Sequence, residues 1–444
     1  MTLDRSRRRF LERGVAFGAT IGTVALAGCS SLDEDDHPAV DATGAELTSI
    51  TEIDPPERLE ELPVDVSDER VEEGIDRVET LLEPIPGPAG LVEEIPNEAV
   101  RNYVDETRKR ARDGLEDVEE EPTNYARLSS LGSPRRRAAE AEAAYAAATD
   151  GLTPDEVEEQ LADLEDELSG TESELTRFGT DDEPQYAVVV YSVVERELDT
   201  AGRFVENAYR PMLGASTVEA VGDLASRYER ATASLEEAQY LIDRQAEVGE
   251  RAFDDEFESA ASALLTDLEE SVERLPLESR DPAEELFDAP VEGTPREWAG
   301  ESAIRRTRSS YDDVSARLEN GRLARALTSL HAAETGRRTI ERLRSIVDDG
   351  GLERPEDADD VRGAKQDAID AIRTARGETS APYLVDRSLG TAISAIRGGD
   401  RRLERDADRS SDRAVLYTTA EYAYAAAWAR ALPGATEWFV DALP

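Results

Sequence analysis

Cys29 is the only cysteine in this chain of 444 residues, and a thiol is well suited to covalent chemistry. A lone cysteine cannot close an intrachain disulfide, so its thiol must have another use. The residues before it form a basic stretch, with five arginines between positions 5 and 13, and then an uncharged run over residues 14–28. This run is shorter than the roughly 18–20 apolar residues of a membrane-spanning helix. The segment therefore predicts a signal peptide over residues 1–28 that is cleaved before Cys29.

Two short patterns in this segment resemble the signals of lipoproteins exported by the twin-arginine route. The first resembles the twin-arginine motif and consists of Ser6, Arg7, Arg8, Phe10 and Leu11. The second resembles a lipobox and consists of Leu26, Ala27 and Gly28 before Cys29. The resemblance is limited to these residues, and it implies a lipid on the Cys29 thiol and anchoring on the extracytoplasmic face of the cell membrane. A basic start, a hydrophobic segment and a chance cysteine are the plainer alternative.

The composition resembles that of proteins from extremely halophilic archaea. There are 100 Asp and Glu against 51 Lys and Arg, the net charge is −49, and Lys109 and Lys365 are the only lysines. Salt at 1 M shortens the Debye length to about 3 Å, so such a charge is tolerable in brine. Disorder is the alternative for a chain this charged, but the recurrent helical spacing argues against it. The same charge argues against nucleic acid as a partner.

Other chemistry has little support in the sequence. The two histidines are His37 and His331, and a metal pair of His331 with Glu334 can be written. Zinc sites use three or four ligands, so a histidine at the edge of a helix seam is the better interpretation. No Gly-x-Ser-x-Gly elbow or glycine-rich phosphate loop is present, and acid pairs in so acidic a chain do not identify a hydrolase. We expect no enzyme, no metal and no cofactor.

Clusters of arginines and of aromatic residues have two interpretations each. The arginines could bind an anion or a partner, although salt bridges to neighbouring acids are favoured, and they lie at 135–137, at 305, 306 and 308, and at 401, 402 and 405. The aromatic residues could line a ligand groove, although core packing is favoured, and they are Tyr145, Tyr191, Tyr422, Tyr424, Trp428 and Trp438.

The elements that must position these residues are helices. Residues 29–64 are acidic and contain Pro55, Pro56 and Pro63, which predicts a flexible tether. Beyond it, apolar residues at helical spacing predict two helical regions, 65–280 and 281–444. The clearest helix begins with a capping box at Thr153–Glu156 and carries a heptad seam as far as Phe178.

Further helix boundaries follow from capping residues. Starts are predicted at Asn97, at Ser133 with Pro134, at Ser216–Glu219 and at Thr294 with Pro295. Asn320 and Gly321 predict a tight turn between two antiparallel helices, and the last helices are expected over 356–376, 382–406, 411–431 and 436–443. The strand-like run 187–194 leads on without a turn residue, so it predicts a buried part of a longer helix.

The expected fold is all-α, with long antiparallel helices in a bundle or in stacked hairpins. Residues 141–148 and 420–427 agree at all but one position, which indicates either a distant duplication or a shared bias towards Ala and Glu. The leading hypothesis for function is a non-enzymatic, lipid-anchored surface scaffold or partner-binding protein, whose protein partner the sequence does not identify. The alternative is a lipoprotein that captures a small molecule or peptide in a groove between helices.

Overall fold

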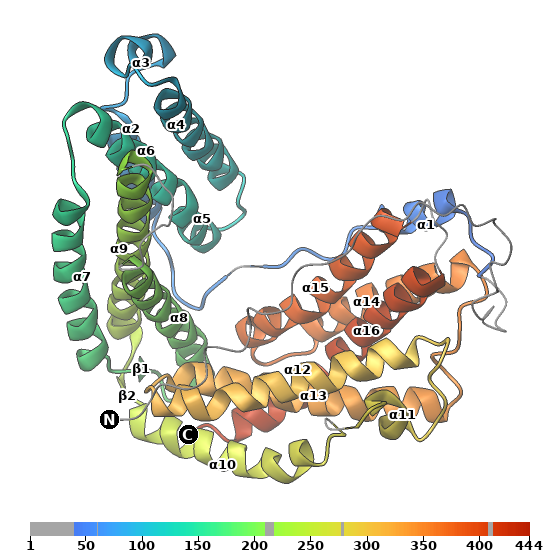
Figure 1. Ribbon diagram of the computed structural model, residues 1–444. Coiled ribbons are helices and arrows are strands. Elements are labelled where there is room, and N and C mark those ends of the chain that lie inside the picture. The colour runs from blue at the N-terminus through green and yellow to red at the C-terminus, as the bar shows by residue number, and fades with distance from the viewer. Residues whose placement is uncertain (1–39, 60, 209–216, 277–278, 407–411) are drawn as a thin grey trace, which may run out of the picture. The chain divides into compact units, whose positions relative to one another are not determined.

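The computed structural model describes residues 40–59, 61–208, 217–276, 279–406 and 412–444, and these residues form an all-α fold (Figure 1). The predicted fold class is therefore confirmed. The described strands are β1 (Phe178–Gly179) and β2 (Arg251–Ala252), which pair antiparallel. Among the described helices, none is both long and apolar enough to cross a membrane.

The first five helices are short or strongly amphipathic. They are α1 (Gly44–Thr51), α2 (Asp68–Leu82), α3 (Pro88–Glu94), α4 (Glu98–Glu119) and α5 (Asn124–Ser130). The Asn97 side chain accepts the backbone N–H groups of Ala99 and Val100, so the predicted start of α4 is confirmed.

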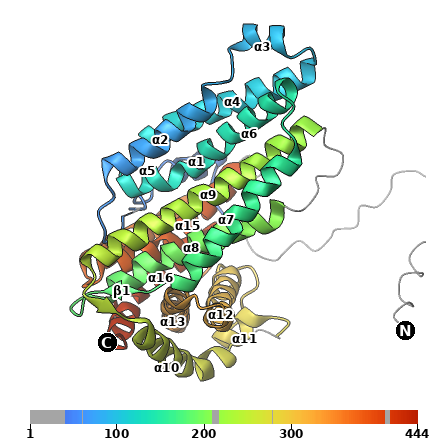
Figure 2. The same ribbon diagram turned by 90° about the vertical axis from the view of Figure 1, so that its left-hand side faces the viewer.

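The next four helices include the longest of the described chain. They are α6 (Gly132–Thr149), α7 (Pro154–Glu174), α8 (Pro184–Ala208) and α9 (Thr217–Val248). The capping box at Thr153 and Glu156 starts α7 as predicted, and its seam residues Val157 and Leu161 are buried. Helix α9 packs against α6, α7 and α8, and Figure 2 shows α7 alongside it. The run 187–194 is helical and entirely buried within α8, as predicted.

The remaining helices follow β2. They are α10 (Asp254–Glu273), α11 (Pro282–Phe287), α12 (Arg296–Glu319), α13 (Leu323–Asp348), α14 (Ala358–Gly377), α15 (Pro382–Asp406) and α16 (Asp412–Asp441). Helices α12 and α13 pack as the predicted hairpin. Gly321 makes the turn with a φ of 68°, a conformation that glycine adopts without strain.

Three local predictions differ from the structure. Ser133 does not cap α6, because the helical backbone of Leu131 leads from α5 directly into it. The seam of α7 stops before Phe178, because residues 178–179 leave the helix and pair with β2. The expected break before Thr436 is absent, and α16 continues through Pro433. Packing of α16 against α12, α13, α14 and α15 outweighs the cost of an interior proline, about 3 kcal/mol. The predicted cap at Ser216 falls outside the described residues.

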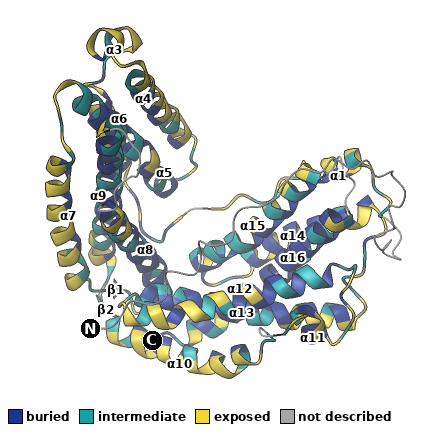
Figure 3. Cartoon of the chain, viewed as in Figure 1, coloured by how far each residue is buried: buried dark blue, intermediate teal, exposed yellow. Residues whose placement is uncertain are grey.

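The buried side chains form three apolar clusters, and Figure 3 shows dark, buried faces along α8, α9, α13 and α16. The largest cluster joins Val190 of α8 to Phe257, Leu327 and Phe439, which lie in α10, α13 and α16. Both predicted helical regions therefore contribute to one core. Their boundary at residue 281 stays a prediction.

Part of the predicted tether, residues 44–51, is helical in the structure. Thr43 and Glu46 form a capping box that starts α1, and Leu47 and Ile50 of this helix are buried in the second core. The prolines at 55, 56 and 63 favour a tether, whereas the capping box and the buried Leu47 and Ile50 stabilise a short helix before them.

Lys365 holds the end of α1 in place. It is one of the two lysines, and it is fully buried. Its Nζ donates to the carbonyl oxygen of Ile50 at 2.9 Å and to Asp400 Oδ1 at 2.8 Å. Tyr422 donates its hydroxyl to the same Asp400 oxygen at 2.5 Å. A cation at the last carbonyls of a helix is favourable, so this ion pair fixes α1 to α14 and α15.

We expect Lys365→Met to lower the free energy of unfolding in molar KCl by about 3–5 kcal/mol, because Asp400 is left buried without its cation. Limited proteolysis should also cut the variant within residues 40–66. The exposed Lys109→Met is the matched control, and equal unfolding midpoints for the two variants would contradict this role.

Candidate functional site

The residues predicted for export and anchoring lie outside the described part of the chain. They are Arg7, Arg8, Phe10, Leu11, Leu26, Ala27, Gly28 and Cys29. Their roles stay predictions.

The aromatic residues considered for a groove do not gather around one cavity. Four of them are buried in two different cores, and these are Tyr191, Tyr422, Tyr424 and Trp428. Tyr145 donates its hydroxyl to Glu94 nearer the surface, and Trp438 is partly buried. The core interpretation is confirmed for the four buried residues.

His331 lies in the interior rather than at a seam edge. Its Nε2 is 3.1 Å from Thr436 Oγ1, and its Nδ1 is 3.2 Å from Ser388 Oγ. Burial lowers the pKa of His331 to about 3, so the ring is neutral near pH 7. Glu334 pairs instead with arginines of its own helix, and the described residues contain no group of three or more potential metal ligands. His331 is therefore a core residue.

Three consecutive charged residues, Glu195–Glu197, follow the apolar run of α8, and both glutamates are buried. Successive residues of a helix point about 100° apart, so the three meet different surroundings. Glu195 faces the start of α13, whereas Arg196 and Glu197 line a cavity.

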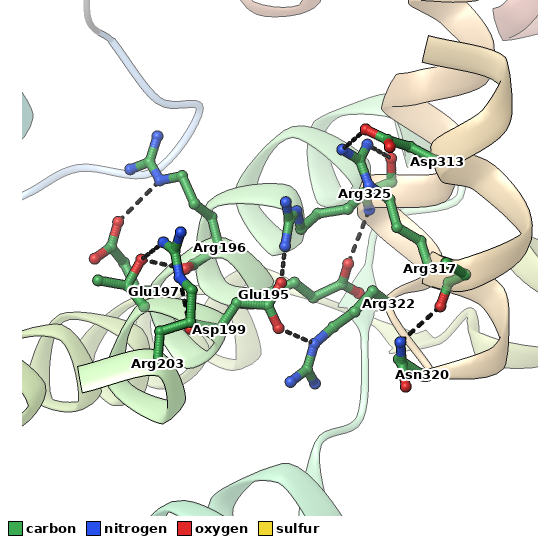
Figure 4. A network of polar contacts seen from close by, with 12 residues as sticks. Glu195, Arg196, Glu197, Asp199, Arg203, Asp313, Arg317, Asn320, Arg322 and Arg325 are labelled. Atoms are coloured by element: carbon green, nitrogen blue, oxygen red, sulfur yellow. Dashed lines mark hydrogen bonds and ion pairs between the residues drawn. The ribbon is translucent and has the colours of Figure 1, made fainter. Parts of the chain in front are cut away.

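Glu195 caps the N-terminus of α13 from another helix (Figure 4). Its Oε1 accepts the N–H of Ala324 at 3.1 Å, and its Oε2 accepts that of Arg325 at 2.8 Å. Arg177, which follows α7, donates Nε to Glu195 Oε1 at 2.8 Å. Helix N-termini carry unpaired N–H groups and partial positive charge, and α13 has no side-chain cap of its own. Burial raises the pKa of Glu195, whereas Arg177 and the two N–H groups favour its charged form.

A cavity of about 1000 Å³ lies beside this cap. The arginines of the α12–α13 turn that line it are neutralised by acids. Arg317 pairs with Asp313, and Arg322 and Arg325 both pair with Asp199, residues that are labelled in Figure 4. Arg322 pairs with Glu172 as well. These pairs stabilise the junction of α8 with the hairpin and leave little charge for a ligand.

A second cavity, of about 680 Å³, has a different balance of charge. Among the described residues, five arginines but only two acids line it, and these are Arg58, Arg196, Arg203, Arg230, Arg387, Glu61 and Glu197. They belong to α8, α9, α15 and the segment 58–62 between α1 and α2. We call this space the arginine cavity.

One face of α8 supplies much of its wall. Arg196, Thr200, Arg203 and Asn207 follow one another at spacings of four, three and four, which places them on one side of the helix. Arg203 is exposed, and it donates to the Asp199 carbonyl oxygen at 3.3 Å and to Thr200 Oγ1 at 3.1 Å. Both acceptors are neutral, so the charge of Arg203 is not compensated by these bonds.

Glu197 is shared between two of the arginines. Arg196 Nε lies 2.9 Å from its Oε1, and Arg230 Nη2 lies 3.7 Å from its Oε2, which also accepts a hydrogen bond from Ser234. Gly132 makes room for Arg230, because a Cβ there would lie 1.4 Å from Arg230 Nη1.

Glu237 of α9 lies near Glu197 and Arg230. It is buried, and its Oε1 has no hydrogen-bond partner among the described residues. Burial, and then the charge of Glu197, raise the pKa of Glu237 to about 8. A carboxyl group that is mostly protonated at neutral pH therefore lies near Glu197, outside the lining of the cavity.

Arg387 of α15 is the distinctive group of the cavity. No hydrogen bond or ion pair joins its guanidinium to another described residue. Burial, and then the positive charges of Arg196 and Arg58, lower the pKa of Arg387 to about 10. Nearby Tyr125 receives a hydrogen bond from Arg196 at 3.0 Å. An arginine that faces other arginines and has no acid beside it is suited to binding an anion.

None of the five arginines that line this cavity belongs to the arginine clusters that the sequence indicates. The polar stripe of α8 was the available signal, because its spacing is helical and it directly follows the apolar run 187–194. Arg387 carries no comparable signal, since only folding brings α15 beside α8 and α5.

Two family models match separate parts of the chain. Residues 69–255 are similar to the family described as Domain of unknown function (DUF8262), and residues 254–441 to the one described as Domain of unknown function (DUF8264). The arginine cavity takes Arg387 from the second range and most of its wall from the first. No curated protein and no solved structure matches the chain.

We expect Glu237→Gln to change how stability depends on pH. The carboxyl group titrates near pH 4.5 when unfolded and near pH 8 when folded, so wild type loses stability as pH rises through this interval. The variant lacks this loss, so its free energy of unfolding should rise by about 1–3 kcal/mol relative to that of wild type between pH 5 and pH 8. Urea unfolding in molar KCl measures it.

The control is Glu247→Gln on the exposed end of the same helix, which should follow wild type. Parallel pH profiles for wild type and Glu237→Gln would show that the carboxyl group titrates normally.

Proposed function

We propose that this protein is a lipid-anchored, extracytoplasmic binding protein that captures a solute in the arginine cavity. Anchoring rests on the lipobox-like residues before Cys29, and export on the pair Arg7 and Arg8. The observation that carries solute capture is Arg387, a charged group that lines a sizeable cavity and has no counter-ion among the described residues.

The cavity favours one of the two functions that the sequence left open. A scaffold needs filled helix seams, whereas capture of a ligand needs an unfilled concave space with converging polar groups. A volume of about 680 Å³ falls within the range of small-molecule sites. We therefore favour capture over the scaffold, and a binding role requires no catalytic group.

The position of the cavity along the chain suits a protein held by its N-terminus. Helix α1 begins at Gly44, fifteen residues after Cys29, and the segment that follows α1 contributes Arg58 and Leu62 to the cavity wall. The binding site thus begins close in sequence to the proposed anchor.

The anchor is tested by Cys29→Ser, which removes the thiol that would take the lipid. We expect the variant to move from the membrane fraction to the soluble fraction, or to accumulate as an uncleaved precursor. Fractionation and mass measurement of the protein from a halophilic host provide the readout. Unchanged fractionation and processing would refute anchoring, and Arg7→Lys with Arg8→Lys tests the export route separately.

Capture is tested by Ser129→Trp, because Ser129 lines the cavity from α5 and no hydrogen bond joins its side chain to another described residue. The larger ring should fill the space. Protein purified natively in molar salt should release a small molecule on denaturation, and the variant should release about ten-fold less. Mass spectrometry of the released solutes measures it, with Ser259→Trp on the distant α10 as the control. If wild type and Ser129→Trp release the same solutes in the same amounts, capture is refuted.

A further inference from the structure

We infer that the captured ligand is a small organic polyanion, whose carboxylate or phosphate groups bind the arginines of the cavity while its carbon skeleton contacts the apolar wall. This inference rests on the proposed capture function and specifies its ligand.

The charges of the cavity leave a positive excess. Glu197 is the one acid bonded to Arg196 and Arg230, so a single negative charge serves two guanidinium groups. Arg203 is bonded to neutral oxygens, and Arg387 to no described residue. At least three of these positive charges are therefore uncompensated by the bonds that the described residues make.

An excess of positive charge in the arginine cavity is unusual for so acidic a protein. The whole chain has a net charge of −49, and the arginines of the neighbouring α12–α13 turn are paired with acids. A partly buried guanidinium without a counter-ion is costly, and the structure places an acid against most others. An anionic ligand would supply the missing charge. The planar fork of arginine matches carboxylate and phosphate oxygens in particular.

A single charge on the ligand is not enough in the salt that the composition indicates. Chloride at molar concentration competes for each guanidinium, and screening weakens any isolated pair. A ligand that carries two or more anionic groups on one skeleton gains from the high effective concentration of the second group once the first is bound. The spread of Arg203, Arg230 and Arg387 over α8, α9 and α15 suits such a ligand.

The rest of the wall indicates an organic skeleton rather than an inorganic ion. Apolar side chains from several elements face the cavity, namely Leu62, Tyr125, Val189 and Phe204. Ser129, Thr200 and Asn207 add groups that can hydrogen-bond to hydroxyls or carbonyls. A cavity of about 680 Å³ is also far larger than phosphate or sulfate requires.

The test is isothermal titration of the full mature protein in molar KCl with five probes. Citrate is the tricarboxylate, phosphoglycolate the phosphate ester, glycolate the monoanion, inorganic phosphate the ion without a skeleton, and glycerol the neutral compound. We expect citrate, phosphoglycolate or both to bind at least about ten-fold more tightly than the other three. Tighter binding of citrate would indicate a carboxylate ligand, and tighter binding of phosphoglycolate would indicate a phosphate ester. Arg387→Leu should weaken that binding by at least about ten-fold.

Arg203→Leu provides a second variant that does not disturb the interior, because Arg203 is exposed, and it should also weaken binding. Arg112→Leu removes the same charge from the exposed side of α4 and should bind like wild type. The inference is overturned if neither polyanion exceeds glycolate and inorganic phosphate, if glycerol binds equally well, or if both arginine variants bind normally. If wild type releases a neutral solute that Ser129→Trp does not, the ligand class is wrong but capture stands. If no released solute distinguishes wild type from Ser129→Trp, capture itself is refuted.

Discussion

The junction of α8 with the α12–α13 hairpin depends on the interactions of the Glu195 carboxylate. This carboxylate is buried, it accepts two backbone N–H groups at the start of α13, and it pairs with Arg177 beyond the end of α7. A buried charge is tolerated only when it is well paired, so these three donors must be present together. They fix α8, the chain after α7 and the α12–α13 hairpin relative to one another. Residues 177–179 then lie where Phe178 and Gly179 can pair with β2.

The same rule of compensation applies to most of the interior polar groups. Arg135 pairs with Glu229, Arg306 with Glu421, and Lys365 with Asp400, each pair having at least one buried member. In a chain with twice as many acids as basic residues, an arginine finds an acid easily. An arginine without one is then more informative than it would be in a protein of balanced charge. Arg387 lines a cavity among other arginines and is paired with no acid among the described residues, so an anion bound there would supply the compensating charge.

Local features were predictable from the sequence, and contacts between distant segments were not. The heptad seam that begins at Val157, the cap at Asn97 and the turn at Gly321 depend on neighbouring residues, and the structure confirms them. Helix α1 depends on Lys365, which lies 315 residues after Ile50, and the start of α13 depends on Glu195, which no local pattern indicates. The arginine cavity lies between these cases, because the stripe on α8 could be read from spacing, whereas Arg387 could not.

The position of the cavity follows from the cap. Glu195, Arg196 and Glu197 are consecutive in α8, so fixing Glu195 against α13 also fixes the directions in which Arg196 and Glu197 point. Arg196 is held further by Glu197 and Tyr125, and Glu197 by Ser234. These bonds are made between the protein's own side chains, so they hold this part of the site in a defined arrangement. A preorganised site loses less conformational entropy when a ligand enters, which matters most where competing salt leaves little binding energy to spare. The cap that stabilises the fold thus also sets the geometry of the proposed binding site.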